Sequence, residues 1–143
     1  MAFLDMVENH KMIVENSGLL TVAALKHLGI KNKKVVAIMS GGNMDVITMS
    51  SVVQQGLVMR DRIFTVSVLL PDKPGELSRV SDIIAKQSGN VIKLEHNQFV
   101  SINRNAAVEL RITMEAFGTD HKHQIMAALE KGGYQPKLVR TNI

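Results

Sequence analysis

The chain has 143 residues, room for one ordinary domain or two small ones, and its 45% hydrophobic content is enough to build a core. It contains no Cys, which excludes a disulfide framework and a thiolate metal site. The net charge of +4 is shared evenly along the chain, and aromatic residues make up only 3%. A basic arm and an aromatic stacking set are therefore missing, so we predict no nucleic-acid partner.

Hydropathy gives no reason to place the chain in a membrane. No apolar run approaches the roughly 20 residues that span a bilayer. The first ten residues, MAFLDMVENH, include acidic side chains and lack the basic start of a signal peptide. We therefore expect no signal peptide, no membrane partner and a cytoplasmic location.

Residues 1–57 predict helix, helix, strand and helix, in that order. In the second helix an apolar stripe recurs every four residues, at Leu20, Ala24 and Leu28. Residues 35–39 are all apolar, which is typical of a strand covered on both faces. The order is that of one piece of an open α/β layer.

The third helix follows Gly41-Gly42, with Asn43 or Asp45 as its N-cap. A strand covered on both faces needs neighbouring strands at its edges and helices on its faces. Fewer than 60 residues rarely supply all of these and remain stable. We therefore expect this segment to depend on a part that it does not itself contain, or to dimerise.

The pattern changes after a short polar joint at residues 58–62. The clearest strand signal lies at residues 108–115, where apolar and polar residues alternate strictly. Further strands are predicted at 63–70, 91–99 and 134–140, with one helix ending at Gly89 and another at Gly132-Gly133. The order βαββαβ is ferredoxin-like, so the predicted fold class is α+β, with both helices on one face of an antiparallel sheet.

Residues 40–43, Ser-Gly-Gly-Asn, end the first predicted strand. A phosphate-binding P-loop would need Gly-Lys-Ser/Thr, and no lysine is present there. A nucleophile elbow would need Gly-x-Ser-x-Gly, but position 38 is Ile. Spacing alone favours a tight turn in which glycine relieves crowding.

Residues 14–45, VENSGLLTVAALKHLGIKNKKVVAIMSGGNMD, resemble the end of the catalytic domain in threonine ammonia-lyases, which have the fold-type II pyridoxal-phosphate fold. In that family the serine of Ser-Gly-Gly-Asn binds the pyridine nitrogen of the cofactor, and the glycines let the backbone pass close to the ring. A glutamate of the Val-Glu-Asn-Ser-Gly type lies near the ring. The implied cofactor-binding residues are Glu15, Ser40, Gly41, Gly42 and Asn43.

The same resemblance implies that two further anchors of the cofactor lie upstream in these enzymes. These are the Schiff-base lysine of a Ser-Phe-Lys motif and a tetraglycine phosphate loop, and neither motif occurs in this sequence. We therefore expect no complete catalytic site and no pyridoxal phosphate bound to this chain alone. The complete enzyme would convert L-threonine to 2-oxobutanoate and ammonia, with the missing catalytic portion as a partner.

Residues 62–143 resemble the ACT regulatory domain that a subset of these lyases carries. The resemblance rests on LPDKPGEL at 70–77 and NVIKLEHNQF at 90–99. Amides at the start of the helix after Pro74-Gly75 favour an anion such as an amino-acid carboxylate, and Asp72 is placed to receive an ammonium group. The implied effector-binding residues are Asp72, Pro74, Gly75, Glu76, Leu77, Asn90 and Ile92.

The predicted organisation is therefore a catalytic-domain fragment at residues 1–60 and an ACT domain at 61–143. The ACT domain would sense a small amino acid and form homo-oligomers. The alternatives are a turn and cap without an effector, and a structural dimerisation module. His121 and His123 cannot share one helix face, so we predict solvated side chains and no metal site.

Overall fold

A computed structural model describes residues 1–97 and 107–142 of the chain. Its contacts divide the chain into two compact units, Met1–Gly56 and Leu57–Ile143. Each unit has its own cluster of buried apolar side chains. The assignment of these units to a catalytic fragment and a regulatory domain stays a prediction.

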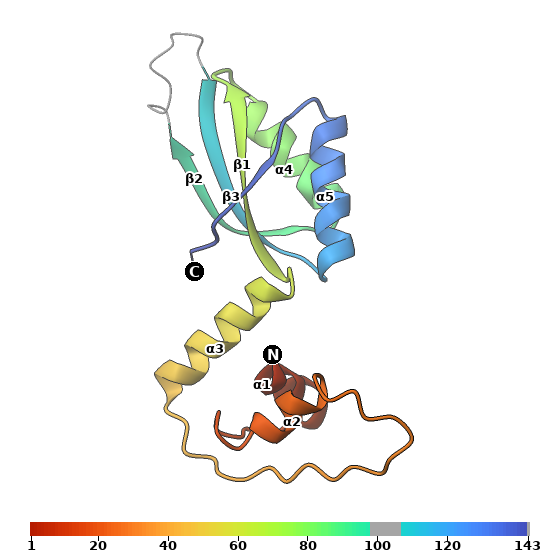
Figure 1. Cartoon of the computed structure of the whole chain (residues 1–143). Coiled ribbons are helices and arrows are strands. Elements are labelled where there is room, and N and C mark those ends of the chain that lie inside the picture. Colours follow the sequence, from red (N-terminus) through yellow and green to blue (C-terminus); the bar gives the residue numbers. More distant parts are fainter. Residues whose placement is uncertain (98–106, 143) are drawn as a thin grey trace. The chain divides into compact units, whose positions relative to one another are not determined.

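The second unit is a four-stranded antiparallel sheet with two helices on one of its faces (Figure 1). The strand order is β2-β3-β1-β4, with each neighbouring pair antiparallel. The elements in chain order are β1 (Ile63–Pro71), α4 (Glu76–Lys86), β2 (Asn90–Asn97), β3 (Ala107–Glu115), α5 (Thr119–Lys131) and β4 (Lys137–Val139). This is the predicted ferredoxin-like βαββαβ fold of the α+β class.

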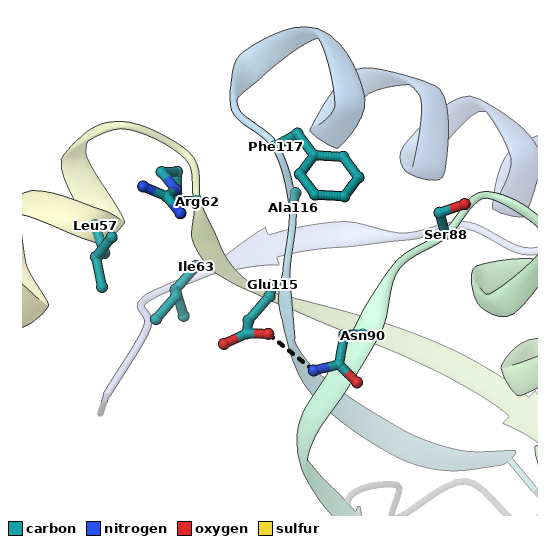
Figure 2. Close-up of a pocket in the computed structure, with 8 residues that line it drawn as sticks. All are labelled: Leu57, Arg62, Ile63, Ser88, Asn90, Glu115, Ala116 and Phe117. Carbon is teal, nitrogen blue, oxygen red and sulfur yellow. Dashed lines mark hydrogen bonds between the residues drawn. The ribbon is translucent and has the colours of Figure 1, made fainter. Parts of the chain in front are cut away.

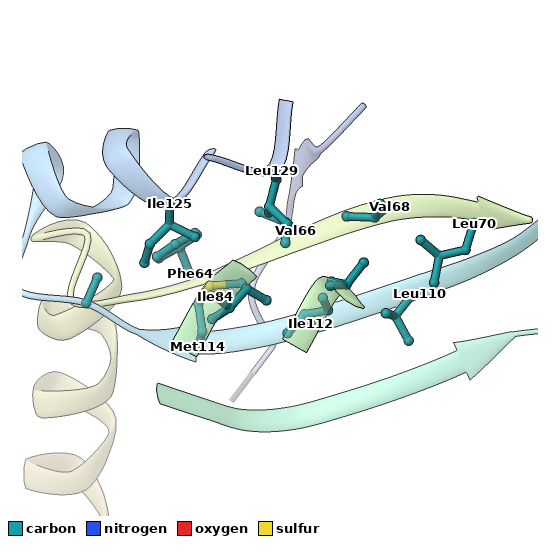
Figure 3. Packing of buried hydrophobic residues seen from close by; sticks show 12 residues of the cluster. Phe64, Val66, Val68, Leu70, Ile84, Leu110, Ile112, Met114, Ile125 and Leu129 are labelled. Atoms are coloured by element: carbon teal, nitrogen blue, oxygen red, sulfur yellow. The ribbon is translucent and has the colours of Figure 1, made fainter. Parts of the chain in front are cut away.

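The core of this unit lies between the sheet and the helices (Figure 3). Strict alternation along β1 and β3 points every second side chain at the helices, and the register sets Val66 opposite Ile112 and Val68 opposite Leu110. From the helices, Ile84 and Ile125 complete the layer. Such burial stabilises by about 1.5–3 kcal/mol per large aliphatic side chain.

A β-bulge explains why the alternation of β2 is mixed in the sequence. Val91 lies opposite Met114 and Lys93 opposite Thr113, so Ile92 is an extra residue between two ladder positions. The bulge shifts the phase by one residue and brings Val91 and Leu94 to the same face. Residues 98 and 99 of the predicted strand lie outside the described residues.

The other face of the sheet carries a polar network. The Thr65 and Thr113 hydroxyls are 2.9 Å apart, and the Ser67 hydroxyl donates to the Glu109 carboxylate at 2.6 Å. The Arg111 Nε donates to the same carboxylate at 3.1 Å. The Ser67 hydrogen bond above all, with Arg111, lowers the pKa of Glu109 against the opposing effect of burial.

The first unit contains helices but not the predicted strand. Its elements are α1 (Ala2–Asp5), the π-helix η1 (Met6–His10), α2 (Leu20–Leu25) and α3 (Val46–Met59), which runs on to the second unit. Residues 35–39 have no regular secondary structure, and Val36 and Ile38 are 87% and 75% exposed. The prediction of a strand there is wrong for this structure, because no described segment pairs with its backbone.

Of the two predicted caps of α3, the structure selects Asp45. The Thr48 amide donates to Asp45 Oδ1 at 2.8 Å, which is the N-cap arrangement. The Thr48 hydroxyl donates to Oδ2 of the same carboxylate, and this bond, followed by the amide bond, lowers the pKa of Asp45. Asn43 has a different partner, described below.

Helix α4 ends in a Schellman motif that has Ser88 where glycine is usual. The Gly89 amide bonds the Ile84 carbonyl at 3.0 Å and the Ser88 amide bonds the Ala85 carbonyl at 2.9 Å. Ser88 therefore adopts a φ of +62°, in the left-handed region that favours glycine.

Replacing Ser88 with glycine should stabilise the second unit. We expect Ser88→Gly to raise the free energy of unfolding by about 0.5–1 kcal/mol, because glycine adopts this backbone conformation without steric conflict. Urea denaturation measures the change. The same substitution inside the helix, Ser81→Gly, should lower the free energy, and a loss of stability in both variants would contradict the prediction.

Replacing Glu109 with glutamine should reveal a pH-dependent contribution to stability. Because the folded-state pKa of Glu109 lies below its ordinary value of 4.5, its carboxylate stabilises the fold above that value and loses this effect as the pH falls through the folded-state pKa. We expect Glu109→Gln to lower the free energy of unfolding by about 1–2 kcal/mol at neutral pH, and by progressively less in acid. Urea denaturation of the two proteins at neutral and at acidic pH measures the difference in free energy of unfolding. A pH-independent difference would refute the assignment.

Candidate functional site

A cavity of about 320 Å³ lies at the loop that joins β1 to α4. The end of β1, the loop and the start of α4 supply most of the wall, and β2 and β3 supply the rest. Five predicted effector residues line it, namely Asp72, Pro74, Gly75, Glu76 and Leu77. We refer to it as the loop cavity.

The backbone of the loop makes a turn directly before α4 begins. The Lys73 amide closes a turn onto the Pro71 carbonyl at 2.8 Å, and Gly75, with φ +91°, precedes the helix. No side chain caps the helix. The amides of its first turn carry the positive end of the helix dipole, which favours a carboxylate.

Glu76 has a different role from the one its place in the motif suggests. Its carboxylate accepts a hydrogen bond from the Tyr134 hydroxyl at 2.9 Å and one from Arg79 at 3.3 Å. Burial, together with this glutamate, raises the pKa of Tyr134. Glu76 therefore connects the start of α4 to the segment after α5. Asp72 is the other acidic side chain that lines the loop cavity, and it is exposed.

The structure does not bring Asn90 and Ile92 to the loop cavity within one chain. Asn90 lies opposite Glu115, which lies opposite Ile63 at the first residue of β1. The loop follows the last residue of β1, and nine residues at about 3.3 Å each separate the two ends. The predicted effector residues thus divide into two groups at opposite ends of the sheet.

Several residues that line the loop cavity are not among the predicted effector residues. Leu70, Pro71 and Lys73 are neighbours of Asp72 in the sequence, whereas two others come from distant strands. His96 comes from the end of β2 and Val108 from the start of β3. Val108 lies opposite Leu70 in the sheet register, next to the loop. No local motif marks either residue, because only strand pairing brings them there.

In the first unit the structure gathers the predicted cofactor-binding residues around one carboxylate. The Asn43 amide donates to Glu15 Oε2 at 3.1 Å, and the Glu15 amide donates to the Gly41 carbonyl at 3.2 Å. The Ser17 hydroxyl donates to Glu15 Oε1. These hydrogen bonds join residues 15–17 to residues 41–43, more than 20 positions away. We call this arrangement the turn around Glu15.

Glycine is required at two points of this turn by close approach. At Gly41, with φ +81°, an added Cβ would lie 2.5 Å from the Glu15 carboxylate. At Gly18 it would lie 1.8 Å from the Ser40 carbonyl oxygen. Gly42 has open space around it, with the nearest heavy atom at 4.0 Å, and Ser40 is exposed.

In residues 1–97 and 107–142, no group of three His, Cys, Asp or Glu side chains is arranged to hold a metal ion. Among the same residues, no helix is long and apolar enough to cross a bilayer.

Comparison with known proteins identifies relatives of the chain. It matches the L-threonine ammonia-lyase of Thermotoga maritima with 30% identity over 139 residues, which is 96% of this chain and 35% of that protein. It matches the L-threonine ammonia-lyase of Geobacter sulfurreducens with 32% identity over 136 residues, 94% of this chain and 34% of that protein. A biosynthetic L-threonine dehydratase of Corynebacterium glutamicum is 32% identical over 94 residues, 65% of this chain and 22% of that protein.

No protein-family model matches the chain. A solved protein of Galdieria sulphuraria aligns with 90% of this chain and 94% of its own length at 18% identity, and its TM-score of 0.43 is too low to support an argument. The relatives above match nearly the whole of the chain, which spans about a third of the first two. The chain is therefore a homologue of the L-threonine ammonia-lyases and corresponds to about a third of their length.

Proposed function

We propose that the chain is the C-terminal regulatory part of an L-threonine ammonia-lyase and that its second unit is an ACT domain that senses a small amino acid. The loop cavity carries this proposal. The first turn of α4 would bind the carboxylate of the amino acid, Asp72 its ammonium group, and Leu70 and Leu77 its side chain. Nothing in this arrangement performs chemistry, so the site is one for binding.

A second copy of the chain would complete this site. Strand β2 is an edge of the sheet, and its apolar residues Val91, Ile92 and Leu94 are 36–43% exposed. Antiparallel pairing of β2 with β2 of a second copy would set the Asn90 end of one strand beside the His96 end of the other. Asn90 and Ile92 of the second copy would then approach the loop cavity, which reunites the predicted effector residues.

The first unit would belong to the catalytic portion of the complete enzyme. Residues 35–39 are apolar and belong to neither a helix nor a strand. No strand among the described residues pairs with them. A sheet edge in the missing catalytic portion would give this segment both its backbone hydrogen bonds and cover for Val36 and Ile38. The effector would regulate only by favouring one arrangement of subunits over another, through unequal affinity for them.

The residues around Glu15 fit one edge of the pyridoxal-phosphate ring. The exposed hydroxyl of Ser40 could bind the pyridine nitrogen, and the open space at Gly42 leaves room beside the ring. Glu15 already accepts two hydrogen bonds and would hold the turn in place. When bound, the cofactor would supply the electron sink for loss of water and ammonia from L-threonine. The lysine and the phosphate loop that anchor it would come from the catalytic portion. The complete enzyme would work in the cytoplasm.

Calorimetric titration tests the loop cavity. We expect at least one of L-isoleucine, L-valine, L-threonine and L-serine to bind the chain, and Asp72→Asn to weaken that binding about tenfold, because the ammonium group loses a charged partner. Glu130→Gln, an exposed carboxylate on α5, serves as the matched control and should leave the affinity unchanged. Absence of heat from all four amino acids would favour a structural dimerisation module.

Sedimentation analysis tests the proposed pairing of β2. Ile92→Lys places a charge on the exposed edge of β2 and should convert the dimer to a monomer while also weakening amino-acid binding. Leu138→Lys makes the same change on the opposite edge strand, β4, where the side chain is 54% exposed. If Leu138→Lys dissociates the dimer and Ile92→Lys does not, the assembly uses the other edge.

A further inference from the structure

A second cavity, of about 290 Å³, lies at the opposite end of the sheet from the loop cavity (Figure 2). The second unit alone supplies all of its lining residues. Its volume is at the small end of the roughly 300–1,000 Å³ usual for ligand sites, which favours a molecule of a few heavy atoms. We refer to it as the sheet-end cavity.

Opposite charges line the sheet-end cavity. Glu115 ends β3 and Arg62 immediately precedes β1, and the sheet register sets Glu115 opposite Ile63. The Asn90 side-chain amide donates to Glu115 Oε2 at 2.8 Å, which orients the carboxylate and leaves Oε1 to accept from a ligand (Figure 2). The Arg62 guanidinium has five N–H donors, so it can bind a carboxylate alongside another partner.

Apolar and neutral polar groups complete the lining. Leu57 and Ile63 contribute aliphatic surface, and Phe117 is 83% exposed beside the cavity. Ser88 adds a hydroxyl from the left-handed position at the end of α4.

The walls of the cavity are held by contacts from outside it. The His121 ring stacks on Phe117 with centroids 4.9 Å apart, and its Nδ1 accepts a hydrogen bond from the Phe117 amide at 3.0 Å. Its Nε2 faces the Gln87 carbonyl, next to Ser88, and so must carry the proton. The prediction that the His121 side chain is solvated is therefore wrong. The ring connects the Phe117 segment to the end of α4 at Gln87.

Hydrogen bonds and an ion pair also hold the part of the wall that contains Arg62. The Ala116 amide donates to the Arg62 carbonyl at 2.9 Å. The carboxylate of Asp61, next to Arg62, accepts from Lys122 at 2.7 Å and from Thr119 at 2.8 Å. A cavity whose walls are held before a ligand arrives loses less entropy on binding.

We propose that the sheet-end cavity is a second binding site, distinct from the loop cavity, for a small zwitterionic amino acid. Glu115 would bind the ammonium group, and Arg62 would bind the carboxylate (Figure 2). The aliphatic residues would contact the side chain of the ligand. A simple amine or a simple carboxylate would match only one of the two charged groups, so the full zwitterion is the ligand that satisfies both.

Amide chemical shifts of the full 143-residue chain test this proposal. We expect L-valine, L-isoleucine or L-threonine at millimolar concentration to shift the signals of residues 62–63 and 115–117, which belong to the sheet-end cavity alone. For valine, the matched probes isobutylamine and isovalerate each lack one charge and should bind at least tenfold more weakly. Shifts confined to residues 71–77, no shifts with any of the three amino acids, or equal binding of a single-charge probe would each overturn the proposal.

Two variants separate the cavities. Glu115→Gln keeps an acceptor for Asn90 and should weaken the sheet-end shifts about tenfold, whereas Asp72→Asn should leave them unchanged. Equal shifts in Glu115→Gln and the unaltered chain would overturn the proposal.

Discussion

The pairing of β1 with β3 is the constraint on which the rest of the second unit depends. Nine consecutive residue pairs, from Ile63 opposite Glu115 to Pro71 opposite Ala107, set which side chains face the helices. The same register determines what meets at each end of the sheet. The loop cavity forms where β1 ends and the sheet-end cavity where it begins, so one ladder positions both candidate sites.

The two cavities differ in how much of each one chain can supply. The sheet-end cavity has its charged groups within a single copy, held by His121 and the Asp61 contacts. The loop cavity has the start of α4 and Asp72, but the other predicted effector residues lie at the far end of the sheet. This division makes the exposed edge of β2 central to the proposed regulation, because pairing across it would complete the loop cavity.

The first unit combines a well-defined turn with an apolar segment that has no regular secondary structure. Its turn around Glu15 is formed, because the hydrogen bonds and the glycine contacts that define it are local to the unit. Residues 35–39 remain without a strand, because a strand needs an edge to pair with. The hydrogen bonds around Glu15 join residues as far as 28 positions apart and need no neighbouring strand, whereas residues 35–39 have no described strand beside them.

Periodicity and contacts a few residues apart predicted the ferredoxin-like order of the second unit, the alternation of β3 and Asp45 as one of two possible caps of α3. The resemblance to a known family predicted that Glu15 and the Ser40-Gly41 turn belong to one site. The bulge at Ile92, the separation of Asn90 from Asp72 and the contacts of His121 became visible in the folded chain alone. Each of these depends on which strand lies beside which, and strand pairing joins residues whose distance along the chain leaves no local pattern.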